Sequence, residues 1–320
     1  MLQLVENRNQ KGRELRTCVV ETLQEMMMYD DKIVALEADL GGASGFTKIQ
    51  KSNPNRFVQC GIAEANMIGV AAGLSITGFK PFVHTFGPFA TRRVFDQLYL
   101  SGAYARNTIN IYGSDPGFTV GANGGTHTTW EDVALIREIP ESVICDAADD
   151  VQMEWILKQF AQMKGIHYVR GNRKAVRNVY EKGSEFTIGK GNVLKKGKDV
   201  LLIVAGQLVS DTLDSVEILE KEGISAEVID MFTIKPLDQE LILKEMQGKK
   251  LIVTIENHSI YGGLGSAVAE ILAEKPIQIP LKRIGVNEQF GQVGTPEYLQ
   301  EVFGLTTNQI INQIKDVYKS

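Results

Sequence analysis

Short apolar runs alternate along this chain with longer segments in which apolar residues recur every three or four positions. The apolar runs are rich in Val, Ile and Leu and lie at residues 32–38, 79–86, 107–115, 199–207 and 249–258. The segments with helical periodicity lie at residues 17–27, 62–74, 96–106, 129–139 and 209–223. Such runs predict buried strands of a parallel sheet, and the alternation predicts helices that connect them. The expected fold class is α/β, with mostly parallel sheets and helices on both faces.

A change in composition divides the chain. Residues 176–198 are rich in Gly and Lys and contain few residues suited to a core, which is typical of a connection between domains. We therefore predict two α/β domains, at residues 15–180 and 199–320, joined by a linker at 181–198. Residues 1–14 are polar and are expected to form an N-terminal arm.

Composition excludes several classes of protein. Of the 320 residues, 43% are hydrophobic and 23% are charged, and a net charge of −5 gives no general attraction to nucleic acid. The longest apolar stretch, residues 200–205, is too short to span a bilayer. Cys18, Cys60 and Cys145 are too few and too far apart for a disulfide framework or a metal site. A globular enzyme of the reducing cytoplasm, without nucleic acid or membrane partners, fits these features.

One acidic residue stands out in a segment of small residues. Glu64 lies in the first turn of the predicted helix at 62–74, where the helix dipole favours a carboxylate. The predicted strand at 79–86 ends at Phe86, and Phe89 follows a Gly-Pro pair. Two interpretations are open. The carboxylate is a helix-end charge beside ordinary core aromatics, or the three residues form a pocket that stacks a flat heterocycle and binds its edge.

Two loops follow predicted strands. Asp39 comes after the strand at 32–38, where open parallel sheets bind ligands, although an acid here also caps turns and helices. Residues 113–127 contain five glycines, which let the backbone bend tightly. His127 comes just before the predicted helix at 129–139 and is either structural or a group that donates a hydrogen bond or moves a proton.

Basic residues flank the first predicted domain. Arg16 precedes its first helix, and Arg170 lies in the segment that is expected to be its last strand. From the residues alone, Arg16 is interpreted as a solvated charge at a helix start and Arg170 as a candidate ligand for an anion, because the guanidinium fork suits phosphate. Glu256 and His258 end the apolar run at 249–258 and are interpreted as structural, since no partner lies near them in the sequence.

These residues carry a resemblance to a known family. GIAEANMIGVAAGLSITGFKPFVHTFGPFATRRVFDQL, at residues 61–98, resembles the pyrimidine-binding domain of transketolases. The likeness continues through VGANGGTHTTWEDVALIREIP, at residues 120–140, to the C-terminus. The resemblance implies that Glu64 binds the aminopyrimidine ring of thiamine diphosphate and helps to activate it, while Phe86 and Phe89 pack against that ring. It also implies that Asp39 is the acid of the family's Ala-Asp-Leu motif.

The resemblance further implies transfer of a two-carbon ketol unit from a ketose phosphate to an aldose phosphate. Arg16 and Arg170 match arginines that bind the substrate phosphate, and His127 matches the histidine of a Gly-x-Thr-His element near the substrate oxygens. Asn123 and Ser114 stand where the family commonly has Asp and His, so their contacts with the usual sugar would be weaker. We therefore expect a substrate whose tail differs, such as a sulfonate or a branched or shorter sugar.

One family motif is missing. The Gly-Asp-Gly that holds Mg²⁺ and the diphosphate, followed about 25 to 30 residues later by an Asn, does not occur, so we expect no metal ligands on this chain. The resemblance then implies a separate N-terminal transketolase subunit that supplies these ligands, in an α2β2 heterotetramer. Two other interpretations are the β subunit of the first component of a 2-oxo acid dehydrogenase and a catalytically silent scaffold.

Overall fold

Two sheets organise the chain, whose residues 2–319 are described by a computed structural model. The strands are β1 (Lys11–Glu14), β2 (Ile33–Glu37), β3 (Phe57–Gln59), β4 (Lys80–Phe86), β5 (Ile109–Ser114), β6 (Val143–Asp146), β7 (Ile166–Gly171), β8 (Ala175–Arg177), β9 (Asn192–Lys195), β10 (Val200–Val204), β11 (Ala226–Asp230), β12 (Thr233–Lys235), β13 (Leu251–Ser259) and β14 (Leu281–Val286). One sheet has the order β12-β6-β7-β5-β4-β2-β3, and the other has the order β14-β13-β10-β11-β9. Within both sheets, neighbours are parallel except at the edge strands β12 and β9.

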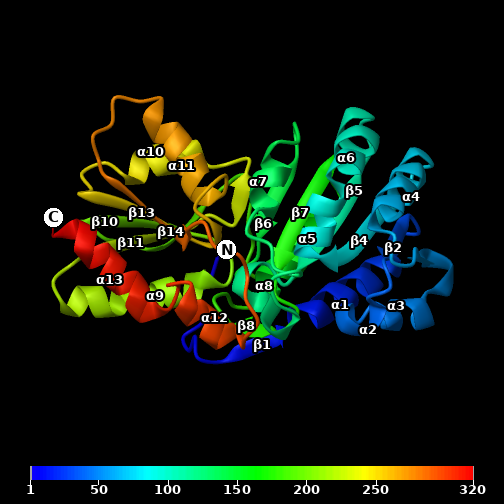
Figure 1. Cartoon of the computed structure of the whole chain (residues 1–320), viewed down its shortest axis with the longest axis horizontal. Helices are drawn as coiled ribbons and strands as arrows, with labels where there is room; N and C mark the ends of the chain where they lie inside the picture. The colour runs from blue at the N-terminus through cyan, green and yellow to red at the C-terminus, as the bar shows by residue number, and fades with distance from the viewer. Residues whose placement is uncertain (1, 320) are drawn as a thin grey trace.

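Helices cover both faces of each sheet, and the two layered domains lie side by side (Figure 1). The α-helices are α1 (Leu15–Met27), α2 (Gly41–Ser44), α3 (Thr47–Ser52), α4 (Glu64–Ile76), α5 (Gly87–Ala90), α6 (Phe95–Gln97), α7 (Asp132–Arg137), α8 (Asp150–Phe160), α9 (Leu208–Lys221), α10 (Gln239–Glu245), α11 (Leu264–Ala273), α12 (Pro296–Val302) and α13 (Thr307–Tyr318). A π-helix at Leu98–Tyr104 and short 3₁₀ turns at Pro54–Arg56, Arg92–Val94 and Gly117–Asn123 complete the set. The predicted α/β class with two domains is confirmed.

The apolar runs form strands that are buried on both faces. In β2, Ile33 and Ala35 belong to the core that contains residues of α1 and α8, whereas Val34 and Leu36 belong to the core on the opposite face, which contains residues of α4 and α7. The first of these two cores continues to α9 and α13 of the second domain, and the other continues to α10 and α11. Because both cores cross between the domains, the two sheets share their apolar interior.

The chain also crosses between the domains in its strands. β12 comes after the predicted linker, yet it pairs with β6 at the edge of the first sheet, with Thr233 opposite Cys145. Lys235 Nζ then donates to the carbonyl groups of Arg137 at 2.7 Å and Ile139 at 2.6 Å, at the end of α7. No local pattern predicts this exchange, because a strand of three residues is too short to show one.

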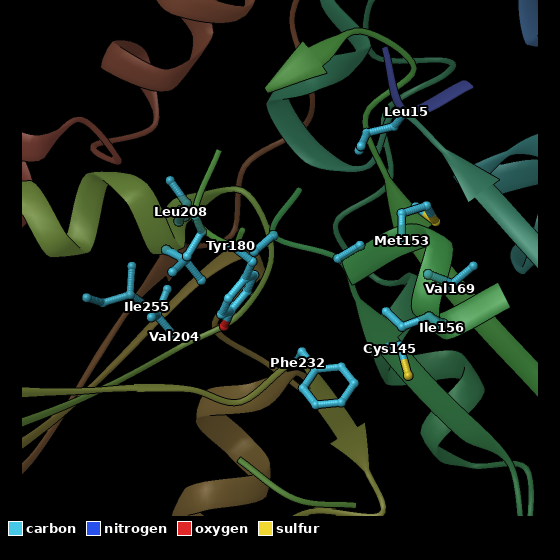
Figure 2. Packing of buried hydrophobic residues seen from close by; sticks show 14 of the residues in the cluster. Leu15, Cys145, Met153, Ile156, Val169, Tyr180, Val204, Leu208, Phe232 and Ile255 are labelled. Atoms are coloured by element: carbon cyan, nitrogen blue, oxygen red, sulfur yellow. The ribbon is translucent and has the colours of Figure 1, made fainter. Parts of the chain in front are cut away.

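The predicted N-terminal arm and the predicted linker contain strands as well. β1 lies at the end of the predicted arm and pairs antiparallel with β8, while β9 lies in the predicted linker and pairs with β11. Figure 2 shows Tyr180 and Phe232 between side chains of the first domain, such as Ile156, and side chains of the second, such as Val204 and Leu208.

Buried carboxylates join the domains beside these aromatic residues. Asp149 accepts a hydrogen bond from the Gln152 amide at 2.9 Å and two more from the amides of Val179 and Tyr180, both at 2.8 Å. Asp230 accepts from the side-chain amide of Gln152 at 2.8 Å and from the Tyr180 hydroxyl. Burial raises the pKa of Asp149 to about 6 and the pKa of Asp230 to about 7.

The raised pKa of Asp230 predicts how the free energy of unfolding depends on pH. Because the pKa of Asp230 is about 7 in the folded chain and about 4 in an unfolded chain, the folded state holds the extra proton between these values. Stability contributed by Asp230 therefore falls as pH rises through this window. We expect Asp230→Asn to reduce the difference between the urea midpoints at pH 5.5 and pH 8, whereas the exposed control Asp31→Asn leaves it unchanged. Equal pH dependence in the three proteins would contradict the assignment.

Candidate functional site

The ends of neighbouring parallel strands bring the predicted ligand-binding segments to one edge of the first sheet. β2 lies between β3 and β4, and β4 lies next to β5. Asp39 follows β2, α4 begins after β3, and Phe86 is the last residue of β4. In an open parallel sheet this carboxyl edge is where ligands bind.

Glu64 is the first residue of α4 and is nearly buried, with 4% of its surface exposed. Arg93, in the turn after α5, forms an ion pair with it, with 2.6 Å between Arg93 Nη1 and Glu64 Oε1. The same guanidinium lies over an aromatic ring, with Arg93 Cζ 3.8 Å from the centroid of the Phe89 ring. The carboxylate therefore has one cation and one aromatic face beside it.

Three rings meet next to this ion pair. The rings of Phe86 and Phe89 contact edge to face with 6.2 Å between their centroids. The His127 ring lies 5.3 Å from Phe86 and 5.1 Å from Phe89, again in edge-to-face contact. The structure thus gathers Glu64, Phe86, Phe89 and His127 around Arg93, although they come from three separate segments of the chain.

His127 is held as a neutral imidazole. Burial lowers its pKa, and the nearby positive charges of Arg93 and Arg173 lower it further. Its Nδ1 lies 2.9 Å from the Thr126 hydroxyl oxygen, which leaves Nε2 for a ligand. A neutral imidazole near pH 7 has one nitrogen that donates and one that accepts, so this residue suits proton transfer at a substrate oxygen.

The second domain positions the glycine-rich loop that carries His127. Asn257, from β13, donates to the Pro116 carbonyl group at 3.0 Å and accepts from the Phe118 amide at 3.1 Å. Gly117 lies between them with φ of 60°, and a Cβ at this residue would come within 2.0 Å of Asn257 Oδ1. Only glycine fits here, so the loop and Asn257 are matched to one another.

Two arginines lie at the other side of the rings. Arg173 Cζ is 4.6 Å from the centroid of the Phe86 ring, and Arg173 Nε contacts Asp115 Oδ2 at 2.5 Å. The Arg16 amide donates to the Arg173 carbonyl group at 3.2 Å, which places the two residues side by side. Arg16 Nε also contacts Glu14 Oε2 at 2.7 Å. Together with Arg93, these two residues make up the basic part of the site.

The prediction that Arg170 binds substrate needs correction. Arg170 is fully buried, with its Nε 2.9 Å from Asp132 Oδ2 and its Nη1 3.1 Å from Asp146 Oδ2. Its Nη2 donates to the Asn257 carbonyl group at 3.0 Å. These contacts join the two domains and leave no accessible surface for an anion. The arginine that reaches the site is Arg173, three residues later.

The two positions that depart from the family pattern have different surroundings. Ser114 is fully buried and its hydroxyl lies 3.0 Å from His84 Nε2, so the predicted contact with substrate is not available to it. Burial lowers the pKa of His84 to about 3, which keeps its ring neutral. Asn123, in contrast, is exposed on the glycine-rich loop.

Asp39 is exposed and has φ of 60°, a conformation that ends β2 with a sharp turn. Its amide donates to Gln59 Oε1 at 2.9 Å, and the Gly61 amide donates to the same oxygen at 2.9 Å. Gln59 therefore ties the loop of Asp39 to the turn that precedes Glu64. The Asp39 carboxylate lies at the carboxyl edge of the sheet without a buried role of its own.

Glu256 and His258 have structural partners, as the sequence indicated. Glu256 accepts hydrogen bonds from the amides of Leu264 at 2.7 Å and Gly265 at 2.8 Å, at the start of α11. His258 Nδ1 donates to the Ser259 carbonyl group at 2.7 Å. The carboxylate fills the place that an anionic ligand would need at this helix end.

Two kinds of site are absent from the part of the chain that the structure describes. Residues 2–319 contain no group of three or more His, Cys, Asp or Glu side chains placed to hold a metal ion. Within the same residues, no helix has both the length and the apolar character needed to cross a membrane.

Two protein-family models match this chain. The family model described as "Transketolase, pyrimidine binding domain" matches residues 11–179, and the one described as "Transketolase, C-terminal domain" matches residues 189–310. The chain belongs to the transketolase family. Members of this family depend on thiamine diphosphate, generally with a divalent metal.

Relatives within the transketolase family include single subunits. The chain is 43% identical over 303 residues to the 6-deoxy-6-sulfo-D-fructose transketolase subunit SqwH of Clostridium sp. (strain MSTE9), covering 95% of this chain and 94% of that one. It is 37% identical to one subunit of the apulose-4-phosphate transketolase of Phocaeicola vulgatus, covering 86% and 88%. A solved structure titled "Split gene transketolase, inactive beta4 tetramer" matches with a TM-score of 0.88 and 37% identity, over 96% of this chain and 99% of that one.

Sequence reasoning missed Arg93, Arg173 and Asn257. Arg93 lies only four residues after Phe89, but α5 ends at Ala90 and Thr91 is not helical, so helical spacing does not account for the contact between them. Asn257 had no local signal either, because its partners Pro116 and Phe118 are about 140 residues earlier.

The contrast between the two arginines predicts different effects of substitution. Arg170→Met leaves Asp132 and Asp146 as buried charges without a cation, so we expect a loss of about 3 to 5 kcal/mol in the free energy of unfolding. Arg173→Met also leaves a buried carboxylate, that of Asp115, but the Arg173 amide still donates to it, so we expect a smaller loss of about 1 to 3 kcal/mol. Urea unfolding of the two variants measures the difference. A wild-type midpoint for Arg170→Met would make this residue a candidate ligand again.

Proposed function

We propose that this chain is the C-terminal subunit of a split transketolase, which transfers a two-carbon ketol unit between sugars that carry an anionic tail. The observation that carries the proposal is the nearly buried Glu64 carboxylate beside Phe86, Phe89 and His127. The relatives of similar span, each described as a transketolase subunit, support it. The intact Gly-x-Thr-His element favours this activity over a 2-oxo acid dehydrogenase component, and the complete group of site residues argues against a silent scaffold.

The site residues fit the aminopyrimidine end of thiamine diphosphate. Aromatic rings and a carboxylate with little exposure suit a flat, proton-sharing heterocycle. When bound, the cofactor supplies the nucleophilic carbon for ketol transfer. Glu64 would hold a proton at the ring edge, Phe86 and Phe89 would orient the ring, and His127 would bind or protonate substrate oxygens. Asp39 would face the cofactor from the end of β2.

The rest of the cofactor site belongs to a partner in this proposal. The chain lacks the Gly-Asp-Gly motif for Mg²⁺ and diphosphate, so an N-terminal transketolase subunit would supply those ligands. Two exposed apolar side chains beside the site offer a surface for that subunit: Ile62, two residues before Glu64, with 77% exposure, and Val293, against Gly124 of the loop, with 69%. We propose an α2β2 heterotetramer in the cytoplasm, where the free thiols of the three cysteines stay reduced.

The substrate tail is proposed to be a monoanion such as a sulfonate. Besides Arg93, which pairs with Glu64, the basic residues near the rings are Arg173 and its neighbour Arg16, and they pair with the carboxylates of Asp115 and Glu14 respectively. This balance leaves little net positive charge for a dianionic phosphate. Asn123 on the loop would bind a hydroxyl without adding charge. The similarity to a subunit described as acting on a sulfonated fructose supports the same choice.

Reconstitution tests the function. We expect the chain alone to show neither turnover nor micromolar binding of thiamine diphosphate with Mg²⁺, and to gain both when its N-terminal partner is added.

Glu64→Gln cannot share a proton with the ring, so the assembled variant is expected to lose at least about 10²-fold in kcat. Calorimetry and coupled assays measure these quantities, and gel filtration checks that the variant still assembles. Near wild-type turnover with Gln at this position would contradict the role of Glu64.

A panel of donors tests the substrate. We expect a higher kcat/KM with 6-deoxy-6-sulfo-D-fructose than with xylulose 5-phosphate, each paired with the same aldose phosphate acceptor. Arg173→Met should raise KM for both donors without changing the order. A specificity constant for xylulose 5-phosphate and ribose 5-phosphate at or above every other pair would show that the enzyme prefers the usual pentose phosphates.

A further inference from the structure

Arg93 contacts both groups that the proposed site offers to a heterocycle, namely the Glu64 carboxylate and the Phe89 ring. Its Nη1 lies 2.6 Å from Glu64 Oε1, and its Cζ lies 3.8 Å above the centre of the Phe89 ring. Among residues 2–319, Glu64 has no other ion-pair partner, so this guanidinium is what balances its charge. A planar cation that donates to a carboxylate and stacks on a ring presents the same features as a planar aminopyrimidine.

The two ends of this ion pair differ in their freedom to move. The Glu64 side chain is 4% exposed, whereas the Arg93 side chain is 44% exposed. Arg93 lies in the short turn at Arg92–Val94, and its guanidinium lies over the Phe89 ring. The arginine can therefore move into solvent while the carboxylate stays in place.

We propose that Arg93 holds the place of the aminopyrimidine ring in the cofactor-free subunit and releases Glu64 and Phe89 when the cofactor enters. This inference rests on the proposed function. It gives the nearly buried Glu64 carboxylate a cationic partner before the cofactor arrives, since an unpaired charge at that position would be costly. It also means that cofactor binding exchanges one partner of Glu64 for another.

The exchange predicts that removing the guanidinium strengthens cofactor binding. Arg93→Met keeps an apolar stem over Phe89 but leaves Glu64 unpaired until the cofactor provides a partner. The broken contacts, an ion pair and a cation–π contact, together correspond to a gain of about tenfold in affinity. Arg92→Gln is the matched control, because Arg92 is the neighbouring residue and pairs with Glu131 at 2.9 Å, away from Glu64.

The first experiment measures the dissociation constant of thiamine diphosphate, with Mg²⁺ present, by calorimetry on the reconstituted complex. We expect Arg93→Met to bind about tenfold more tightly than wild type, Arg93→Lys to lie between them, and Arg92→Gln to match wild type. Unchanged or weaker binding by Arg93→Met would overturn the exchange, because Arg93 would then be neutral toward the cofactor or support it directly.

A second experiment uses the full chain without its partner or cofactor. Arg93→Met, Glu64→Gln and the double variant are compared by their urea midpoints. We expect each single variant to lower the midpoint and the double variant to be no less stable than Arg93→Met, because the two residues act as a pair. Additive losses would overturn the pairing. Absence of cofactor binding by the wild-type complex, even with coupling intact, would instead overturn the proposed function and the exchange with it.

Discussion

The burial of one arginine between two acids holds this molecule together. Arg170 takes up the charges of Asp132 and Asp146 and binds the backbone of Asn257, so a residue of β7 fixes α7, β6 and a strand of the other domain at once. The side chain of Asn257 then binds the glycine-rich loop on both sides of Gly117. The place of His127 relative to Phe86 therefore depends on a buried ion cluster.

The site itself is close to electrical balance. Each arginine near the rings has its own carboxylate: Arg93 has Glu64, Arg173 has Asp115 and Arg16 has Glu14. A ligand that enters here must break or share such pairs. Because a partner ion weakens the pull of each guanidinium on a further anion, the charge and shape of the ligand matter more than a general attraction.

Much of the fold could be predicted from local pattern, since strands buried on both faces are uninterrupted apolar runs and amphipathic helices follow them. The aromatic and acidic residues of the site could be placed as well, because Glu64, Phe86 and Phe89 lie at strand and helix ends that parallel topology brings to one edge. The distinction between Arg170 and Arg173 could not be made. Both occur in one short basic segment, and what separates them is Asp146, which stands opposite Arg170 on the neighbouring strand.

The short strand β12 affects how the chain folds during synthesis. The edge of the first sheet at β6 is covered only by residues 233–235, which come after β9, β10, α9 and β11 in the sequence. During synthesis the β6 edge of the first sheet therefore stays unpaired until more than half of the strands of the second sheet have been made. A chain cut at the predicted linker, residues 181–198, would be divided between the two family domains. Its first part would lack β12, so β6 would be free to pair with any extended chain nearby.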